Sequence, residues 1–118
     1  MAIHNDIGKN GESLAAAFLE SKGYTIVCKN WRHSHYEIDI IASKGKKLHF
    51  IEVKTRSSAL YGHPEDSVTK KKFRFLKNAA DEYLFLNPGH RWIQYDILSI
   101  TFQKDAPAAY FLLEDVFL

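Results

Sequence analysis

Cysteine, proline and glycine are scarce in this sequence, and each scarcity excludes a class of protein. The single cysteine among 118 residues cannot form an internal disulfide, which excludes a disulfide-stapled secreted scaffold and indicates a reducing compartment. Six glycines and three prolines are too few for a collagen-like or low-complexity chain. No run approaches the ~20 apolar residues that span a bilayer, and residues 1–10 lack the layout of a signal peptide. We therefore expect a cytoplasmic protein with no membrane partner.

The composition is that of one globular domain with an uneven charge distribution. Hydrophobic residues make up 46% and charged residues 25% of the chain, and 118 residues fit a single domain over 1–118. The net charge is +2, yet residues 1–77 hold 14 Lys/Arg and 8 Asp/Glu, whereas residues 78–118 hold 2 and 6. One run contains no acid: Lys70, Lys71, Lys72, Arg74 and Lys77. This run indicates either a solvated helix face or a surface that attracts a polyanion.

Two segments have the periodicity of amphipathic helices. The first covers about residues 8–22, ends near Gly23, and has an apolar stripe formed by Leu14, Ala15, Phe18 and Leu19. The second covers about residues 65–87 and ends at Asn87-Pro88-Gly89. Its expected buried stripe consists of Val68, Phe75, Leu76, Ala79, Tyr83 and Leu86.

Five further segments predict strands. They are expected at residues 24–29, 36–42, 47–55, 91–102 and 109–117. Polar connections are expected at residues 30–35, 43–46, 57–64 and 104–107. The resulting order, α-β-β-β-α-β-β, predicts an α/β fold with a mixed β-sheet flanked by α-helices.

The two clearest strands form an expected antiparallel hairpin with a charged end on one face. Because side chains alternate across a strand, Glu52 and Lys54 share one face, with His49, Ile51 and Val53 on the other. In the preceding strand, the face shared by Glu37, Asp39 and Ile41 is opposed to that of Ile38 and Ile40.

The expected turn sets the register between these strands. If the turn is centred on Lys44 and Gly45, the numbers of paired residues sum to an odd value near 89. Every such register places Asp39 on the face of Glu52 and Lys54, with backbones about 5–8 Å apart. That span suits one hard cation between two carboxylates.

These residue types fit metal-dependent phosphodiester hydrolysis. Mg²⁺ is commonly held by one or two carboxylates with waters and substrate phosphate, and a metal lowers the pKa of its bound water. A neighbouring lysine orients the water or neutralises the charge of the transition state. The alternative is a surface salt-bridge ladder across the hairpin. The apolar context of both strands favours the metal site, because unpaired charges inside a sheet are costly.

An ordered set of motifs runs through most of the chain, from about residue 8 to residue 117. The motifs are Gly11-Glu12, Asn30-Trp31-Arg32, residues 37–41 (EIDII), residues 51–56 (IEVKTR), residues 58–62 (SALYG), Ser67-Val68-Thr69 with Lys72, and Tyr95-Asp96-Ile97. This set resembles the YraN-like uncharacterised proteins of bacteria, a group similar to Holliday-junction resolvases in the restriction-endonuclease-like superfamily with its D…(D/E)xK core. Two positions depart from that pattern: Tyr36 stands where glycine is usual and Gln94 where arginine is usual, although Arg91 is close by.

The resemblance implies roles for particular residues. Asp39 and Glu52 would be ligands of Mg²⁺ or Mn²⁺, and Lys54 would be the catalytic lysine. Glu12 would assist at the metal, although a first-turn acid favoured by the helix dipole is an equal alternative. The residues expected to contact nucleic acid are Arg32, Arg56, Lys70, Lys71, Lys72 and Arg74.

Three functions follow as hypotheses. The first is a nuclease-like protein that cleaves nucleic acid, DNA rather than RNA, with branched or structured DNA as one substrate and a homodimer as one arrangement. The second is a catalytically inactive nucleic-acid-binding module of the same restriction-endonuclease-like fold, and the third is a protein-interaction domain.

Other residues carry weaker signals. His33 and His35 are interpreted as loop histidines and not as a zinc site with His49, since no cysteine or acid completes the set. Cys28, Trp31 and Trp92 are interpreted as core residues. Tyr61 is a candidate for stacking on an unpaired base.

Overall fold

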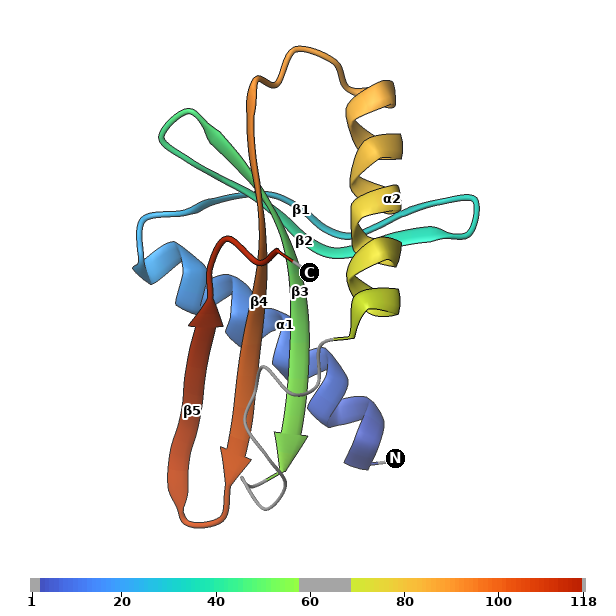
Figure 1. Cartoon of the computed structure of the whole chain (residues 1–118). Helices are drawn as coiled ribbons and strands as arrows, with labels where there is room; N and C mark the ends of the chain where they lie inside the picture. The colour runs from blue at the N-terminus through green and yellow to red at the C-terminus, as the bar shows by residue number, and fades with distance from the viewer. Residues whose placement is uncertain (1–2, 58–68, 118) are drawn as a thin grey trace.

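The computed structural model describes the backbone of residues 3–57 and 69–117 and the side chains of residues 11–57 and 69–117. Its elements follow the predicted order α-β-β-β-α-β-β (Figure 1). They are α1 (Ile3–Ser21), β1 (Thr25–His33), β2 (Tyr36–Lys44), β3 (Lys47–Ser57), α2 (Lys70–Leu86), β4 (Trp92–Gln103) and β5 (Ala106–Leu113). The predicted α/β class is confirmed. The motif residues 58–62 and 67–68, Tyr61 among them, lie outside the described residues.

The strands form one mixed sheet in the order β1-β2-β3-β4-β5. Consecutive strands pair antiparallel, except that β3 and β4 pair parallel from Lys47↔Trp92 to Ser57↔Phe102. Parallel neighbours need a crossover connection, and α2 lies in the segment that joins them. The long central pair β3–β4 therefore forms the middle of the sheet, with β1 and β5 at its edges.

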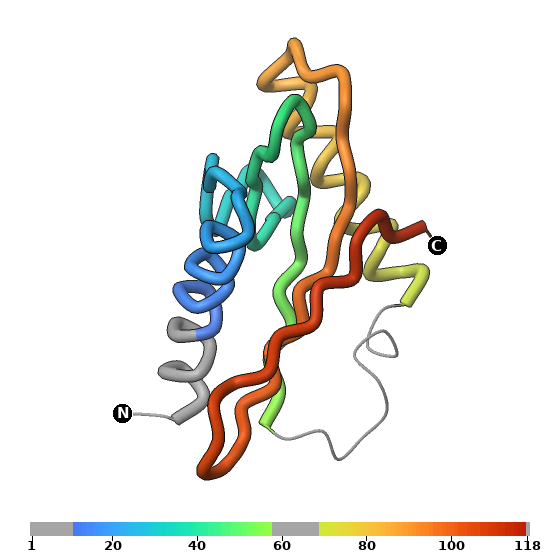
Figure 2. The backbone as a smooth tube through the Cα atoms, turned by 90° about the vertical axis from the view of Figure 1, so that its left-hand side faces the viewer, coloured from blue at the N-terminus to red at the C-terminus, as the bar shows by residue number. Residues whose placement is uncertain are grey.

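The two helices cover opposite faces of this sheet, as Figure 2 shows. On one face, Ala15 and Leu19 of α1 are buried against Ile40, Ile51 and Leu98. On the other, the buried face of α2 packs against side chains of β2 and β3: Ile38, Ile41, Leu48 and Phe50. The predicted stripe of α1 is confirmed, since Leu14 and Phe18 pack against the same cluster as Ala15 and Leu19.

The second helix begins with a capped turn and buries a different face from the one predicted. Thr69 is extended (φ −112°), and its Oγ1 accepts a hydrogen bond from the backbone N–H of Lys72 at 3.1 Å. The buried residues of α2 are Phe73, Leu76, Ala79, Ala80 and Tyr83. Burial of Phe75 and Leu86 was a wrong prediction, because these side chains are 55% and 44% exposed. Successive residues on a helix lie about 100° apart. The observed buried stripe of α2 is rotated from the predicted one by part of a turn, and this rotation buries Phe73 and exposes Phe75.

The outer strands also differ from their predicted bounds. β1 continues through the expected polar connection to His33, and the reversal is confined to Ser34-His35, with Ser34 in the left-handed region (φ 58°). β5 spans Ala106–Leu113 instead of 109–117, because the turn at residues 104–105 is shorter than expected. Trp92, expected in the core, is 62% exposed at the start of β4. Across the described residues, neither helix is both long and apolar enough to cross a membrane.

Candidate functional site

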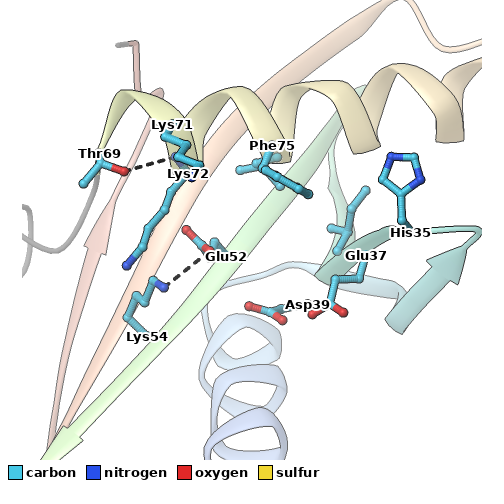
Figure 3. A pocket seen from close by; sticks show the side chains of 11 residues that line it. His35, Glu37, Asp39, Glu52, Lys54, Thr69, Lys71, Lys72 and Phe75 are labelled. Carbon is cyan, nitrogen blue, oxygen red and sulfur yellow. Dashed lines mark hydrogen bonds and ion pairs between the residues drawn. The ribbon is translucent and has the colours of Figure 1, made fainter.

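A pocket of about 500 Å³ lies between the N-terminal half of α2 and the sheet (Figure 3). From the sheet side its lining comes from the β1–β2 turn, β2 and β3: His35, Glu37, Ile38, Asp39, Glu52 and Lys54. From the helix side its lining consists of Thr69, Lys71, Lys72, Phe75 and Leu76. The pocket thus combines three carboxylates and three ammonium groups with an apolar wall.

The β2–β3 hairpin brings Asp39 and Glu52 to this pocket. Paired residue numbers sum to 91, as in Ile41↔Phe50 and Ile40↔Ile51, which is an odd value near the predicted 89. The ladder ends at Ile40↔Ile51, and the next residues along this register are Asp39 and Glu52. The pocket contains all three side chains that the alternation placed on one face, since Lys54 also lines it.

The alternation fails at one predicted position. Ile38 was expected on the face opposite Ile41, but both side chains pack in the cluster beneath α2. The irregularity coincides with Asn30 of β1, which has a left-handed φ of 54° between the pairs Lys29↔Ile40 and Trp31↔Ile38. The pairing of β1 with β2 keeps its register across this point, since the numbers of both pairs sum to 69.

Burial and neighbouring charges perturb Asp39. Its pKa is raised from the usual 3.8 to about 6, mainly because the carboxylate is removed from water. The charges of Glu52, Glu12 and Glu37 add to this rise, while the hydrogen bond from the Val53 N–H to Asp39 Oδ2 (2.8 Å) opposes it. Negative charge therefore accumulates around Asp39, and a divalent cation would relieve it.

Positive charge accumulates at the other end of the pocket. Lys54 Nζ lies 3.5 Å from Glu52 Oε1, and both side chains are largely buried (29% and 24% exposed). The pKa of Lys72 is lowered, first by the charge of Lys54 and also by a hydrogen bond to its side chain. Two ammonium groups, one from β3 and one from α2, thus approach each other at the pocket (Figure 3). An anion bound between them would reduce their repulsion.

A site with two carboxylates suits Mg²⁺, which keeps several of its waters, better than a metal ion coordinated by protein ligands alone. Among the described residues, no three His, Cys, Asp or Glu side chains converge closely enough to hold a metal ion. Asp39 and Glu52, on adjacent strands of one pocket, would supply two oxygen-bearing groups, which is the usual protein share for Mg²⁺.

Glu12 is placed near this pair without lining the pocket. Its Oε2 accepts a hydrogen bond from Asn30 Nδ2 at 2.8 Å, and its charge reaches Asp39. Gly11 permits the close packing of α1 on β3 here, because a Cβ at this position would lie 2.6 Å from Thr55 Cγ2. The predicted role of Glu12 at the metal stays a prediction.

Of the six residues predicted to contact nucleic acid, Lys71 and Lys72 line the pocket. Arg32 of β1 and Lys70 and Arg74 of α2 are exposed outside its lining. Arg56 is partly buried, and its Nε donates to Thr101 Oγ1 at 3.4 Å.

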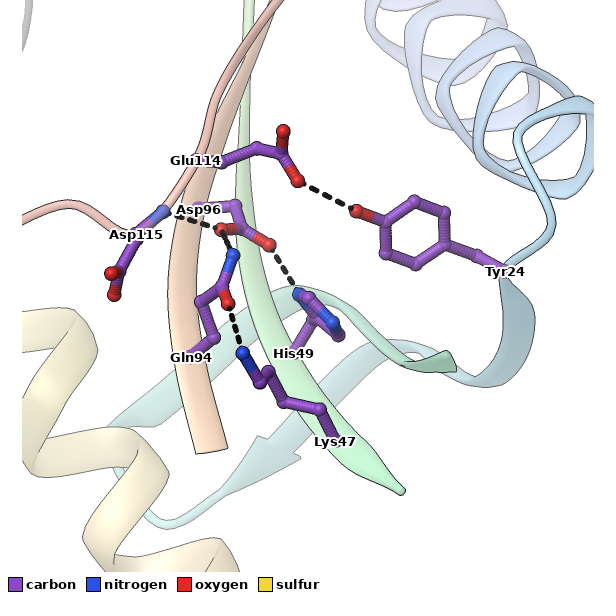
Figure 4. Close-up of polar contacts among 7 residues, drawn as sticks. All are labelled: Tyr24, Lys47, His49, Gln94, Asp96, Glu114 and Asp115. Carbon is purple, nitrogen blue, oxygen red and sulfur yellow. Dashed lines mark hydrogen bonds and ion pairs between the residues drawn. The ribbon is translucent and has the colours of Figure 1, made fainter. Parts of the chain in front are cut away.

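The sequence reasoning missed a buried polar network in which His49 takes part (Figure 4). His49 lies in β3, as the strand pattern predicted, and is 4% exposed, with Nδ1 2.6 Å from Asp96 Oδ2. Asp96 Oδ1 accepts from Gln94 Nε2 and from the backbone N–H of Asp115, both at 2.9 Å. Gln94 Oε1 in turn accepts from Lys47 Nζ at 3.0 Å, so the glutamine that replaces the usual arginine belongs to this network. A histidine flanked by the apolar residues Leu48 and Phe50 was the signal for burial.

Comparison with known proteins assigns the chain to a family. A family model described as uncharacterised protein family UPF0102 matches residues 11–100. The chain belongs to this family. The matched range includes every residue that lines the pocket. The resemblance to YraN-like proteins is confirmed, because UPF0102 is the YraN-like family.

Several bacterial relatives carry the same family name. The UPF0102 protein of Bacteroides thetaiotaomicron is 43% identical over 100 residues, which cover 85% of this chain and 83% of that protein. The relative from Flavobacterium psychrophilum is 46% identical over 100 residues, covering 85% and 84%. The one from Clostridium perfringens is 43% identical over 104 residues, covering 87% and 85%. These names state no activity, so a function for this UPF0102 protein is inferred from its site.

Proposed function

We propose that this UPF0102 protein is a metal-dependent, nuclease-like protein that binds nucleic acid, DNA rather than RNA, and hydrolyses phosphodiester bonds. The observation that carries the proposal is the convergence of Asp39, Glu52 and Lys54 in one pocket beside Lys72. The proposal includes membership of the restriction-endonuclease-like superfamily, which the motif order favours.

Each residue has a distinct part in this proposal. Asp39 and Glu52 would hold Mg²⁺ or Mn²⁺, which when bound polarises a phosphoryl oxygen and lowers the pKa of water. Lys54, held beside Glu52 at 3.5 Å, would position the attacking water or stabilise negative charge on the phosphoryl group. Lys72 would neutralise a second phosphate oxygen, because it approaches Lys54 from the opposite wall.

The test compares two pocket variants with matched controls. Glu52→Gln and Lys54→Met remove one charge each from the pocket, whereas Glu20→Gln on α1 and Lys46→Met in the β2–β3 turn change exposed charges. Branched, single-stranded and duplex DNA and RNA are incubated with each protein, with and without Mg²⁺ or Mn²⁺. We expect metal-dependent cleavage by the wild type and both controls and none by the pocket variants, with circular dichroism showing that all are folded. Cleavage that persists in both pocket variants would refute the assignment.

One observation favours a second candidate, a nucleic-acid-binding module without catalysis. The Glu52 carboxylate is already paired with Lys54, which leaves it less available to a metal. Binding that is salt-dependent but unchanged by Mg²⁺ and by Lys54→Met would support this candidate. The homodimer and the cytoplasmic location stay predictions.

A further inference from the structure

Phe75 is an exposed aromatic side chain on the wall of a charged pocket. It is 55% exposed, while its α2 neighbours Phe73 and Leu76 are 7% and 6% exposed. Within the described part of the chain, no aromatic ring stacks on it. Figure 3 shows the side chain pointing from α2 toward Glu37 and His35. A ring in such a position can stack on a planar ligand.

The pocket places this ring at a fixed offset from the lysines. Lys71 and Lys72 precede Phe75 by four and three residues on the same helix, so all three lie on neighbouring positions of one helix face. Lys54 approaches Lys72 from β3. The pocket therefore has a cationic end and an aromatic end about one helical turn apart. A nucleotide has the matching layout, with an anionic phosphate and a planar base separated by one sugar.

We infer that this pocket binds one unpaired nucleotide, with its phosphate between Lys54 and Lys72 and its base stacked on Phe75. The inference rests on the proposed function and adds its substrate class, a single strand or a locally unpaired nucleotide. A volume of about 500 Å³ lies in the range of pockets that hold a small ligand. Inside a duplex both faces of a base are already stacked, so Phe75 has a free face to meet only at an unpaired base.

The test measures binding in EDTA by fluorescence anisotropy, so that no cleavage interferes. The probes are a labelled DNA octanucleotide, the RNA octanucleotide of the same sequence and a blunt-ended DNA duplex without unpaired bases. The variants are Phe75→Ala, Phe75→Trp as a conservative replacement, and Phe111→Ala as a control at a phenylalanine on β5 that is 44% exposed. Since Phe75 and Phe111 are both exposed, we expect all variants to fold, which a melting curve checks.

We expect Phe75→Ala to weaken single-strand binding about 10- to 100-fold and duplex binding less than about threefold, because stacking on one aromatic ring contributes to this extent. Phe75→Trp should retain wild-type affinity, and Phe111→Ala should have no effect. A loss of affinity of Phe75→Ala for the DNA strand, the RNA strand or both supports the inference. The strand that shows the loss identifies the sugar, deoxyribose or ribose, that the pocket accepts.

Two outcomes would overturn the inference, and they are distinguishable from failure of the proposed function. Equal losses for single strand and duplex, or no loss for either, would remove Phe75 from base recognition while leaving nucleic-acid binding and cleavage intact. If the wild type binds none of the three probes, the proposed function fails, and the inference fails with it.

Discussion

The backbone N–H of Val53 donates to Asp39 Oδ2 at 2.8 Å, at the point where the β2–β3 ladder has ended. Beyond Ile40↔Ile51 a side-chain bond thus replaces the main-chain pairing between the two strands. This contact holds the Asp39 carboxylate against β3, beside Glu52. The Asp39 carboxylate is thereby held within reach of the charges of Glu52, Glu12 and Glu37, and their repulsion affects the stability of the folded state.

The first prediction concerns Asp39→Asn. Because the folded pKa of Asp39 is raised to about 6, the folded state binds this proton more tightly than the unfolded chain does. The stability gained from protonation is fully present below about pH 4 and is lost as the pH rises through about 6. Asparagine carries no charge and its Oδ1 can still accept from Val53. We expect the variant to be more stable than the wild type at pH 7.5 by at most about 3 kcal/mol, and equal to it near pH 4.

Urea unfolding in EDTA at several pH values measures this difference. Asp105→Asn in the β4–β5 turn is the matched control, because Asp105 is exposed and asparagine tolerates its left-handed φ of 61°. A stability difference between Asp39→Asn and the wild type that does not grow from pH 4 to pH 7.5 would contradict the raised pKa.

The second prediction concerns divalent cations. A cation bound between Asp39 and Glu52 offsets their repulsion and stabilises the folded state alone, by about 2.7 kcal/mol at one hundred times its Kd. For a domain of 118 residues this corresponds to a rise in Tm of roughly 10 °C. Differential scanning fluorimetry with Mg²⁺ or Mn²⁺ at pH 7.5 should show the rise in the wild type and in Asp105→Asn. The Asp39→Asn and Glu52→Gln variants should show none, and an undiminished rise in both would place the cation elsewhere.

The third prediction concerns the phosphate contact proposed for Lys72. Each lysine that neutralises one phosphate adds about one to the slope of log affinity against log salt. We expect Lys72→Met to weaken DNA binding and to reduce this slope by about one, measured by anisotropy between 50 and 200 mM salt. Lys104→Met, at an exposed lysine of the β4–β5 turn, should leave the slope unchanged. An unchanged slope for Lys72→Met would exclude a direct contact between this lysine and a phosphate.

The central hairpin was predictable because its physics is local. Strand alternation and a short turn are sufficient to bring Asp39, Glu52 and Lys54 to one face, and the register sum of 91 is odd, as that argument requires. The face of Ile38 was not predictable from the period of two, since Ile38 and Ile41 pack in the same cluster beneath α2 although three positions separate them. Nothing in the sequence of β2 itself records that irregularity.

The helix side of the pocket depended on tertiary packing. Phe73 and Phe75 both fit an apolar stripe of α2. Which of the two is buried depends on how α2 docks on the sheet, where the ring centroids of Phe73 and Tyr95 of β4 lie 5.4 Å apart. The predicted burial of Phe75 therefore failed at the residue that lines the pocket. The pairing of His49 with Asp96 likewise requires the parallel neighbours β3 and β4, which are separated by 47 positions in the chain.

The last prediction concerns Asp96, whose fully buried carboxylate joins three parts of the chain. It contacts His49 of β3 and Gln94 of β4, and it accepts the backbone N–H of Asp115 beyond β5. Asp96→Ala leaves these buried polar groups without their acceptor, so we expect the free energy of unfolding to fall by about 3–5 kcal/mol. Asp96→Asn keeps the size and one acceptor oxygen and should cost less, about 1–3 kcal/mol.

The control for this prediction is Asp115→Asn, which changes an exposed charge but keeps the backbone N–H that Asp96 accepts. Its stability should stay within about 0.5 kcal/mol of the wild type, since asparagine tolerates the left-handed φ of 55° at this position. Urea unfolding of the four proteins at pH 7.5 gives the comparison. If Asp96→Ala were as stable as Asp115→Asn, the network would be a consequence of the packing of β3 on β4 and not one of its causes.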